Sequence, residues 1–383
     1  LLRYDGKAWA LSNSPTTNIL RAVWGSSASD VWAVGNGGAL LHFDGSAWTQ
    51  ATPPSGSVTL NAVAGSGPTD VWAVGNTGTI LHYDGTWTMV SSGVLYDLTG
   101  VYASANQVMV TGSGSQVLQK MGASFVSVGT NTAPLRGISG AGDNSVLAVG
   151  DSGTMQRWDG TMLSPQSGSP SSYMLRGIST RAADDAWVAG TEGALLHWNG
   201  QGLSRLNVPT SQALEAVFAL AKDNVWAVGD RGTLAHFDGT SVSTYGSSGV
   251  LDTSDLRAVS STSASDLWAV GLNNTIVHNT GGGWVPVAMP SSCKAVPAMA
   301  TVSCGCDTMP GGESTNRNAG LLSVRPSTSR TMTFAMTRWR SWRSARLRSS
   351  SPAGAAAQRK SHISPAPSEI GRASCRERVS SPV

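Results

Sequence analysis

The sequence predicts an all-β protein, a seven-bladed β-propeller of four-stranded antiparallel blades, and three observations support this prediction. A unit of about 39 residues recurs seven times between Leu20 and Trp284. Its apolar runs are short and rich in Val, Leu, Ile and Trp, with no stretch at helical spacing long enough to indicate a helix. Clusters of Gly, Asn, Asp and Ser separate the runs, as expected for tight turns. Short strands repeated at such a period are typical of propeller blades.

Each repeat contains a glycine that closes a WAVG-like segment, and this glycine marks the period. Successive copies are 40, 37, 38, 40, 39 and 42 residues apart. The copies are Gly35, Gly75, Gly112, Gly150, Gly190, Gly229 and Gly271. An almost constant interval assigns one blade to each copy.

The first complete repeat predicts the four strands of one blade, which we call A, B, C and D from the axis outward. They cover residues 20–25 (LRAVWG), 30–35 (DVWAVG), 39–45 (ALLHFDG) and 47–51 (AWTQA). Strands B and C are joined by turns such as Gly-Asn-Gly-Gly at 35–38, where Gly and Asn or Asp are expected to supply the positive φ angles. Strands C and D are joined by Asp-Gly, a dipeptide that favours hairpins.

The third repeat keeps the apolar pattern but loses several of the recurring residues. Residues 104–125 align without a gap to the first repeat, yet Met109 stands in place of Trp and Met121-Gly122 in place of Asp-Gly. Apolar residues of suitable size can preserve a packed blade without the other residues.

The two ends of the chain depart from the complete repeats. Residues 1–9, LLRYDGKAW, match strands C and D of the following repeat and predict a partial blade, so the domain limits are 1–9 for this part and 10–290 for the seven repeats. Because the chain opens on half a blade and on Leu, it is expected to be a fragment that has lost any signal peptide. A truncated eight-bladed ring is the alternative to seven blades.

Residues 291–383 lose the repeat and are rich in Arg, Ser, Pro and Ala, which predicts a disordered basic tail. Residues 369–379, EIGRASCRERV, resemble the translation of a short-read sequencing adapter. We therefore expect that this tail arises from a frameshift near residues 287–293 followed by adapter sequence.

The charge of the chain differs between these two parts. Residues 1–290 hold 12 Lys and Arg against 19 Asp and Glu, a formal charge of −7, whereas residues 291–383 hold 14 against 4, or +10. A basic patch is the usual mark of nucleic-acid binding, and the repeat domain lacks the required excess. The sequence therefore predicts no nucleic-acid partner, and no apolar run reaches the length of a membrane span.

Neither a metal site nor a cofactor is expected. All four cysteines, Cys293, Cys304, Cys306 and Cys375, lie in the tail. Five histidines occupy one equivalent position on strand C, in separate blades, so they should not converge on one ion. They are His42, His82, His197, His236 and His278. We interpret them as structural residues beside the hairpin, and the recurring Trp of strand B as filling the space between neighbouring blades.

The repeat unit resembles the BNR/YVTN-type propeller repeats, a group that includes Asp-box proteins and photosystem-II-assembly-factor-like propellers. The resemblance rests on the LxAV strand, the [DN]xWAVG strand and the hairpin ending in DGxxW, and it covers residues 1 to about 288. It implies a propeller fold. An Asp-box has the form Ser-x-Asp-x-Gly-x-Thr-Trp, and here the residue between Asp and Gly is absent, so sialidase chemistry does not transfer.

The same residues argue against an enzyme. Glycoside hydrolysis generally needs two carboxyl groups facing each other, or a Tyr nucleophile in sialidases. The only glutamates of the repeats, Glu192 and Glu215, lie in different blades, and most aspartates occupy turns. A glycosidase of the Asp-box type is kept only as an alternative.

A set of arginines at the start of strand A is the candidate ligand-binding site. They are Arg21, Arg136, Arg176 and Arg257, with Asn61, Thr99 and Glu215 at the equivalent positions of the other repeats. Strand A is innermost, so these side chains should surround the mouth of the central channel, where guanidinium groups can bind a carboxylate or sulfate. The alternative is that each Arg pairs with an acidic or carbonyl group of the adjacent blade.

The sequence thus predicts a non-catalytic binding or scaffold propeller, expected to be monomeric, that recognises a protein or an anionic carbohydrate. A structural or adhesive surface repeat protein is the alternative. The few lysines and abundant Gly, Ser and Thr of the repeats favour an extracellular, cell-surface or periplasmic bacterial protein.

Overall fold

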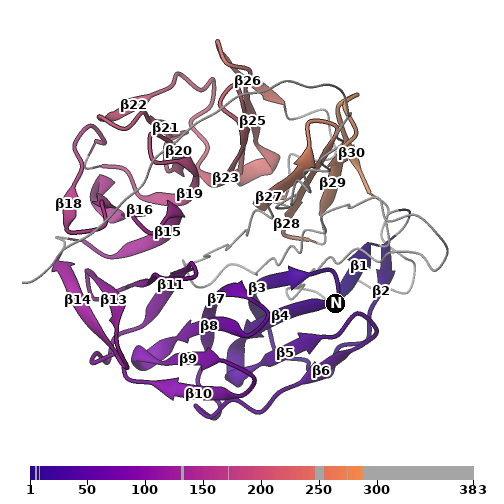
Figure 1. The fold of residues 1–383 in the computed structure, drawn as a ribbon. Helices are drawn as coiled ribbons and strands as arrows, with labels where there is room; N and C mark the ends of the chain where they lie inside the picture. The colour runs from indigo at the N-terminus through magenta and orange to yellow at the C-terminus, as the bar shows by residue number, and fades with distance from the viewer. Residues whose placement is uncertain are drawn as a thin grey trace, which may run out of the picture. The chain divides into compact units, whose positions relative to one another are not determined.

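Seven antiparallel four-stranded sheets and one two-stranded sheet follow one another around an axis (Figure 1). A computed structural model of the chain describes residues 1–287 except 5–6, 8, 131–132, 171, 246–253 and 274. The seven sheets confirm the predicted seven four-stranded blades. The predictions made for residues 291–383 lie outside the described residues. Among those described, no helix has the length and apolar character needed to cross a membrane.

The first three blades run in chain order, with the first strand of each innermost. Blade 1 comprises β3 (Leu20–Ser27), β4 (Asp30–Gly35), β5 (Leu40–Phe43) and β6 (Trp48–Gln50). Blade 2 comprises β7 (Leu60–Gly67), β8 (Asp70–Gly75), β9 (Ile80–Tyr83) and β10 (Trp87–Val90). Blade 3 comprises β11 (Leu98–Ala103), β12 (Val108–Gly112), β13 (Gln116–Met121) and β14 (Ser124–Thr130).

The remaining four blades repeat this order. Blade 4 comprises β15 (Leu135–Gly142), β16 (Ser145–Gly150), β17 (Met155–Trp158) and β18 (Leu163–Pro165). Blade 5 comprises β19 (Leu175–Ala182), β20 (Asp185–Gly190), β21 (Leu195–Trp198) and β22 (Leu203–Arg205). Blade 6 comprises β23 (Leu214–Ala221), β24 (Asn224–Gly229), β25 (Leu234–Phe237) and β26 (Val242–Tyr245). Blade 7 comprises β27 (Leu256–Ser263), β28 (Asp266–Gly271), β29 (Ile276–Asn279) and β30 (Trp284–Pro286).

The Trp of strand B packs against the outer strands of the next blade, as the sequence predicts. The ring centroid of Trp32 lies 4.8 Å from that of Tyr83 and 5.0 Å from that of Trp87, both in blade 2. The same contact joins later blades through Trp72 and Phe125, Trp187 and Phe237, and Trp226 and Trp284. Large buried rings at this spacing hold neighbouring blades together.

The N-terminal hairpin lies between the last blade and the first. It consists of β1 (Leu2–Tyr4) and β2 (Trp9–Leu11). The ring centroid of Trp268 in blade 7 lies 4.8 Å from that of Tyr4 and 5.3 Å from that of Trp9. Tyr4 and Trp9 therefore contact Trp268 in the same way as the outer-strand aromatic residues of blades 2, 3, 6 and 7 contact the strand-B Trp of the preceding blade.

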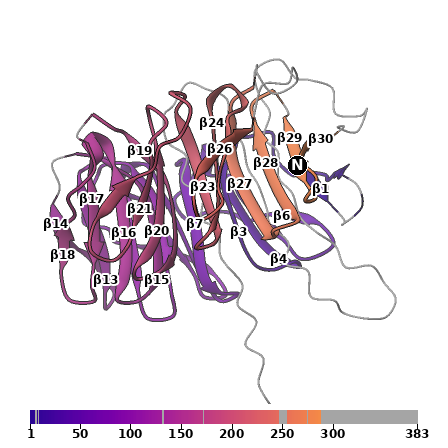
Figure 2. The ribbon, with the colours of Figure 1, turned by 90° about the horizontal axis from the view of Figure 1, so that it is seen from above.

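The other side of this hairpin contacts blade 1. The Arg3 guanidinium carbon lies 4.6 Å from the centre of the Phe43 ring, and Leu1 packs against the apolar cluster of blade 1. Neighbouring innermost strands pack against each other from β3 round to β27. Leu2 and Trp9 of the hairpin pack in one apolar cluster with Ala258 of β27. The hairpin thus holds the place of the outer half of an eighth blade (Figures 1 and 2).

The turns confirm one sequence expectation and correct another. Gly45 of the C–D turn has φ 97°, and the Asp44 carboxylate accepts the N–H groups of Ala47 and Ser46. These bonds, led by that from Ala47, lower the pKa of Asp44 to about 2.

In the B–C turns of blades 1, 2, 4 and 6, positive φ does not fall on the Asn or Asp that follows the first glycine, as the sequence had predicted. In blade 1 it falls on Gly37 and Gly38, with φ 60° and 70°. Gly35 is extended, and it is required because a Cβ there would overlap the carbonyl of Ile19. The side chain of the Asn or Asp that follows this glycine instead bonds the second residue of strand A, as Asn36 bonds Arg21.

Candidate functional site

The second residue of every A strand is the extra residue of a β-bulge. In blade 1, Leu20 pairs with Gly35 and Ala22 with Val34, so Arg21 has no opposite residue on β4. The same register shift recurs in all seven blades. We call these seven residues the inner ring: Arg21, Asn61, Thr99, Arg136, Arg176, Glu215 and Arg257. A bulge redirects its side chain, and here it does so on the innermost strand of each blade.

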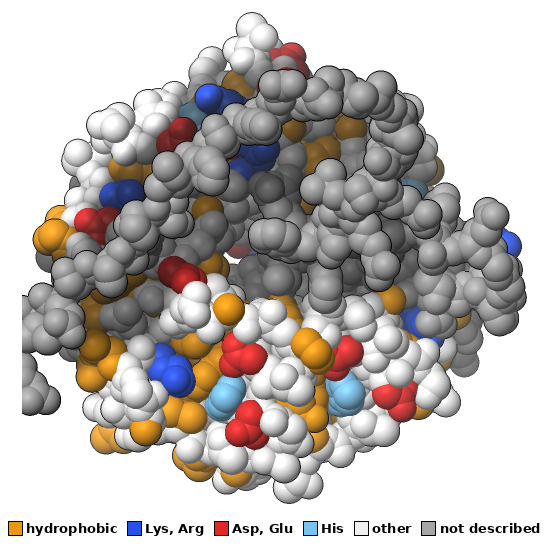
Figure 3. Space-filling view, viewed as in Figure 1, with side chains coloured by type: hydrophobic (Ala, Val, Ile, Leu, Met, Phe, Trp, Pro, Cys, Tyr) orange, Lys and Arg blue, Asp and Glu red, His pale blue; other side chains and the backbone are white. Residues whose placement is uncertain are grey.

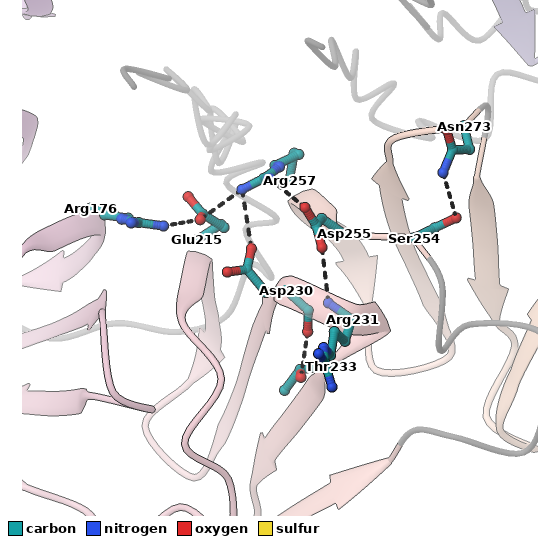
Figure 4. A network of polar contacts seen from close by, with 9 residues as sticks. All are labelled: Arg176, Glu215, Asp230, Arg231, Thr233, Ser254, Asp255, Arg257 and Asn273. Carbon is teal, nitrogen blue, oxygen red and sulfur yellow. Dashed lines mark hydrogen bonds and ion pairs between the residues drawn. The ribbon is translucent and has the colours of Figure 1, made fainter. Parts of the chain in front are cut away.

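Blades 5 to 7 join their inner-ring residues in one network (Figure 4). Glu215 accepts hydrogen bonds from Arg176 of blade 5 and from Arg257 of blade 7, the latter at 2.7 Å. Arg257 also bonds Asp255 at 2.6 Å and Asp230 at 3.3 Å. The structure therefore brings two of the four predicted arginines together, on a carboxylate that belongs to the same ring.

This network carries more negative than positive charge. Three carboxylates, those of Glu215, Asp230 and Asp255, surround two guanidinium groups. Burial raises the pKa of Asp230, and the charges of Glu215 and Asp255 raise it further, against the lowering effect of Arg257. Burial and the neighbouring carboxylates thus both disfavour the charged form of Asp230.

Arg136 makes a separate pair inside blade 4. Its Nε and Nη2 atoms both bond the Asp151 carboxylate, the second at 2.6 Å. Asp151 is the residue after the WAVG-like glycine, and Asp230 and Asn36 hold the same place in their blades. The polar residue of the B–C turn therefore serves as a partner for the inner ring instead of supplying positive φ.

The inner ring is mostly uncharged in blades 1 to 3. Asn61 donates to the Asn76 side chain and to the Leu98 carbonyl, both at 2.8 Å, and Thr99 donates to the Leu135 carbonyl at 3.0 Å. These bonds tie each blade to the next without charge.

Arg21 is the exception in this uncharged half. Its Nε donates to the neutral Asn36 side chain, and among the described residues no carboxylate forms an ion pair with it. Burial lowers the pKa of Arg21, and the nearby charge of Asp97 partly offsets this. A guanidinium remains charged at neutral pH, so Arg21 retains donors for an anionic group.

The recurring histidines stay inside their own blades, as predicted. His82 Nε2 bonds Asp70 at 2.9 Å, the Trp72 indole N–H donates to the same carboxylate at 2.8 Å, and the His82 and Trp72 rings stack with centroids 3.9 Å apart. Asp185, Asn224 and Asp266 build equivalent networks with the His and Trp of their own blades. Asp30 bonds His42 at 2.7 Å, and Trp32 stacks on His42 without donating its indole N–H to Asp30. This role of the strand-B aspartate was not predicted from the sequence.

The described part of the chain contains no group of three or more His, Cys, Asp or Glu arranged to hold a metal ion. Of the two glutamates considered as catalytic groups, Glu215 is held by Arg176 and Arg257, and Glu192 is an exposed residue of the blade 5 B–C turn. The inner ring therefore offers charged and hydrogen-bonding groups.

The blades and the repeated bulge define this chain as a β-propeller repeat protein. No family model matches the sequence, and neither does any curated protein. YCF48 from Cyanidioschyzon merolae is similar in structure, with 16% identity and a TM-score of 0.54 over 71% of this chain and 98% of that one. A YCF48 structure bound to D1 peptide has 16% identity and a TM-score of 0.55 over 73% and 96%.

A third similar structure is an inactive virginiamycin B lyase from Staphylococcus aureus with quinupristin. It has 12% identity and a TM-score of 0.55 over 70% of this chain and 96% of the lyase. At these identities the similarity establishes the propeller fold alone.

Proposed function

We propose that this chain is a non-catalytic binding propeller whose inner ring holds a polypeptide segment. An acidic group of the segment binds Arg21, and a basic group binds the carboxylates of blades 5 to 7. The observation that carries the proposal is the unequal ring. Within the described part of the chain, the side-chain partner of Arg21 is neutral, whereas three carboxylates share two guanidinium groups on the other side.

The distribution of charge favours a ligand that carries both signs. A polyanion would meet Asp151, Glu215, Asp230 and Asp255 beside the arginines that it needs. Acidic and basic side chains are also interspersed on the face displayed in Figure 3. Polypeptides carry both signs on one chain, and complementary charges fix the register of such partners.

Two comparisons bear on the proposal. The YCF48 structure with D1 peptide provides a precedent for peptide binding by this fold. The lyase provides a precedent for catalysis by this fold. In this chain, however, the carboxylates of Glu215, Asp230 and Asp255 form ion pairs with Arg257. We further propose the extracellular, cell-surface or periplasmic location that the composition favours.

The test selects peptides from a random phage-displayed library on the immobilised full chain and measures the affinity of the enriched peptides. We expect enriched peptides to contain both an acidic and a basic residue. Arg21→Ala should weaken their binding by about tenfold or more, since a charged hydrogen-bonded pair at an interface is lost. Lys222→Ala is the control, because Lys222 is an exposed cation in the turn between β23 and β24, at the end of β23 opposite the inner ring, and its removal should leave binding unchanged.

Two outcomes would overturn the proposal. One is that the parent chain enriches no peptide, which would favour a structural or adhesive repeat protein. The other is that Arg21→Ala binds the enriched peptides as the parent does. An array of anionic glycans is run in parallel, and Arg21-dependent binding there instead of to peptides would make the ligand a carbohydrate.

A further inference from the structure

The B–C turns present exposed side chains on an unfavourable backbone. The third residue of this turn has φ between 54° and 60° in six blades. These residues, which we call the loop ring, are Gly37, Thr77, Ser152, Glu192, Arg231 and Asn273. All six are exposed. In blade 3 the positive φ falls on Ser115 instead.

Glycine is the residue that this conformation favours, yet only blade 1 has it. L-residues are disfavoured at positive φ, and a β-branched residue such as Thr77 most strongly. The next residue of the turn, Gly38 in blade 1 and Gly78 in blade 2, is glycine, because a Cβ there would overlap a neighbouring backbone carbonyl. The fourth residue of the turn is thus constrained by packing, whereas the third varies in size and charge.

Contacts inside the fold account for two of the five side chains of the loop ring: the Thr77 hydroxyl donates to the Asn76 carbonyl at 2.7 Å, and the Asn273 amide donates to Ser254 at 3.4 Å. Among the described residues, no hydrogen bond or ion pair is made by the side chains of Ser152, Glu192 or Arg231. The backbone is held independently of them: the N–H of Thr77 donates to Asp97, and that of Arg231 to Asp255, both at 3.0 Å. The turn therefore keeps its form whatever side chain the third residue has.

The loop ring lies at the same end of the blades as the inner ring. Arg21 bonds Asn36, the residue immediately before Gly37. Blade 1 thus combines two features. Among the described residues, the side-chain partner of its inner-ring Arg21 is the neutral Asn36, and the third residue of its B–C turn is Gly37, which has no side chain. Backbone strain that the interior does not use is typical of positions that contact a ligand.

We infer that the loop ring determines specificity for the partner. Thr77, Ser152, Glu192, Arg231 and Asn273 contact the residues that flank the segment bound on the inner ring, and Gly37 leaves the approach to Arg21 open. The inference rests on the proposed polypeptide-binding function. Glu192 selects a basic flanking residue and Arg231 an acidic one.

The test uses peptides enriched on the parent chain and two matched variants of the full chain. One variant replaces the five side-chain-bearing residues of the loop ring by Gly, and the other replaces them by Ala. Both should weaken peptide binding by about tenfold or more. Only the Gly variant should raise the thermal midpoint, because Gly relieves the positive-φ strain and Ala does not.

Charge exchange at two positions gives a second readout. Selection on Glu192→Lys with Arg231→Glu should enrich peptides whose flanking charges are exchanged relative to those of the parent.

The outcomes separate this inference from the proposed function. If the Gly variant binds as the parent does while Arg21→Ala loses binding, the loop ring is not a contact surface and the inner-ring proposal stands. A lowered thermal midpoint in the Gly variant would assign the five side chains a structural role. Failure of the parent to enrich any peptide would overturn both proposals.

Discussion

Blades 2 and 3 have the same four strands but different polar interiors. In blade 2, Asp70 accepts hydrogen bonds from His82, Trp72 and Ser66. In blade 3, Gln107 takes the place of the Asp and Gln119 the place of the His. The Gln119 amide donates a single hydrogen bond of 3.2 Å to Gln107.

Met109 takes the place of the indole in blade 3 and is fully buried. The backbone pairing survives, with Met109 opposite Gln119 as Trp72 is opposite His82. Apolar filling is therefore sufficient to form a blade, and the Asp, His and Trp network adds stability to a fold already specified.

The largest expected loss of stability comes from removing an aromatic side chain that packs between two blades. Trp72→Ala should destabilise the protein by about 3–5 kcal/mol, because it removes a fully buried indole that contacts both His82 and Phe125. Met109→Ala is the matched change in blade 3 and should remove about 2–3 kcal/mol. Urea denaturation measures both, and equal losses would show that the indole adds nothing beyond apolar volume.

Removal of the carboxylate should have an intermediate effect. Asp70→Ala leaves three donors without their acceptor and should destabilise by about 1–3 kcal/mol. Gln107→Ala breaks one bond between uncharged groups and should cost less than about 1 kcal/mol. If the two variants unfold at the same urea concentration, the network of blade 2 does not stabilise the blade.

The smallest effect is a dependence on acid. Burial alone would raise the pKa of Asp266, but hydrogen bonds from Thr262, His278 and Trp268 outweigh burial and lower it below the ordinary value of 3.8. The stabilisation is therefore present above about pH 4 and is lost as the pH falls through the folded-state pKa. The Asp266 side chain is 38% exposed, so solvent screening keeps the effect small.

Asp266→Asn tests this dependence. The unfolding midpoint of the variant should fall less steeply than that of the parent between about pH 5 and pH 2.5. Parallel curves for parent and variant would contradict the assignment.

The sequence predicted the fold because the repeat is read directly from residue spacing. The four strands of blade 1 were placed to within two residues, and strand B was placed without error. The His, Asp and Trp network was missed, although strand alternation could have revealed it: Asp30 and Trp32 lie on one face of strand B, and Trp32 is opposite His42.

The inner ring was located from the sequence, and the alternative that its arginines pair with acidic groups of the adjacent blade holds for Arg176 and Arg257, but the individual partners were not predicted. The bulge at Arg21 depends on the pairing register, which a repeat alone does not specify. The bonds of Arg257 to Glu215 and Asp230 cross from one blade to the next and depend on how the sheets are placed. Whether these arginines bind a ligand stays a prediction.

The N-terminal hairpin also bears on the order in which the protein folds. Strand pairs within a blade join residues close in sequence, whereas Trp9 and Trp268 come together from opposite ends of the repeats. Joining such distant segments requires loop-closure entropy that local hairpins do not. The blades can thus form in succession as a linear array, with closure by the hairpin as the last step. We expect the same contact to open before the hydrogen-bonded blades when the protein unfolds.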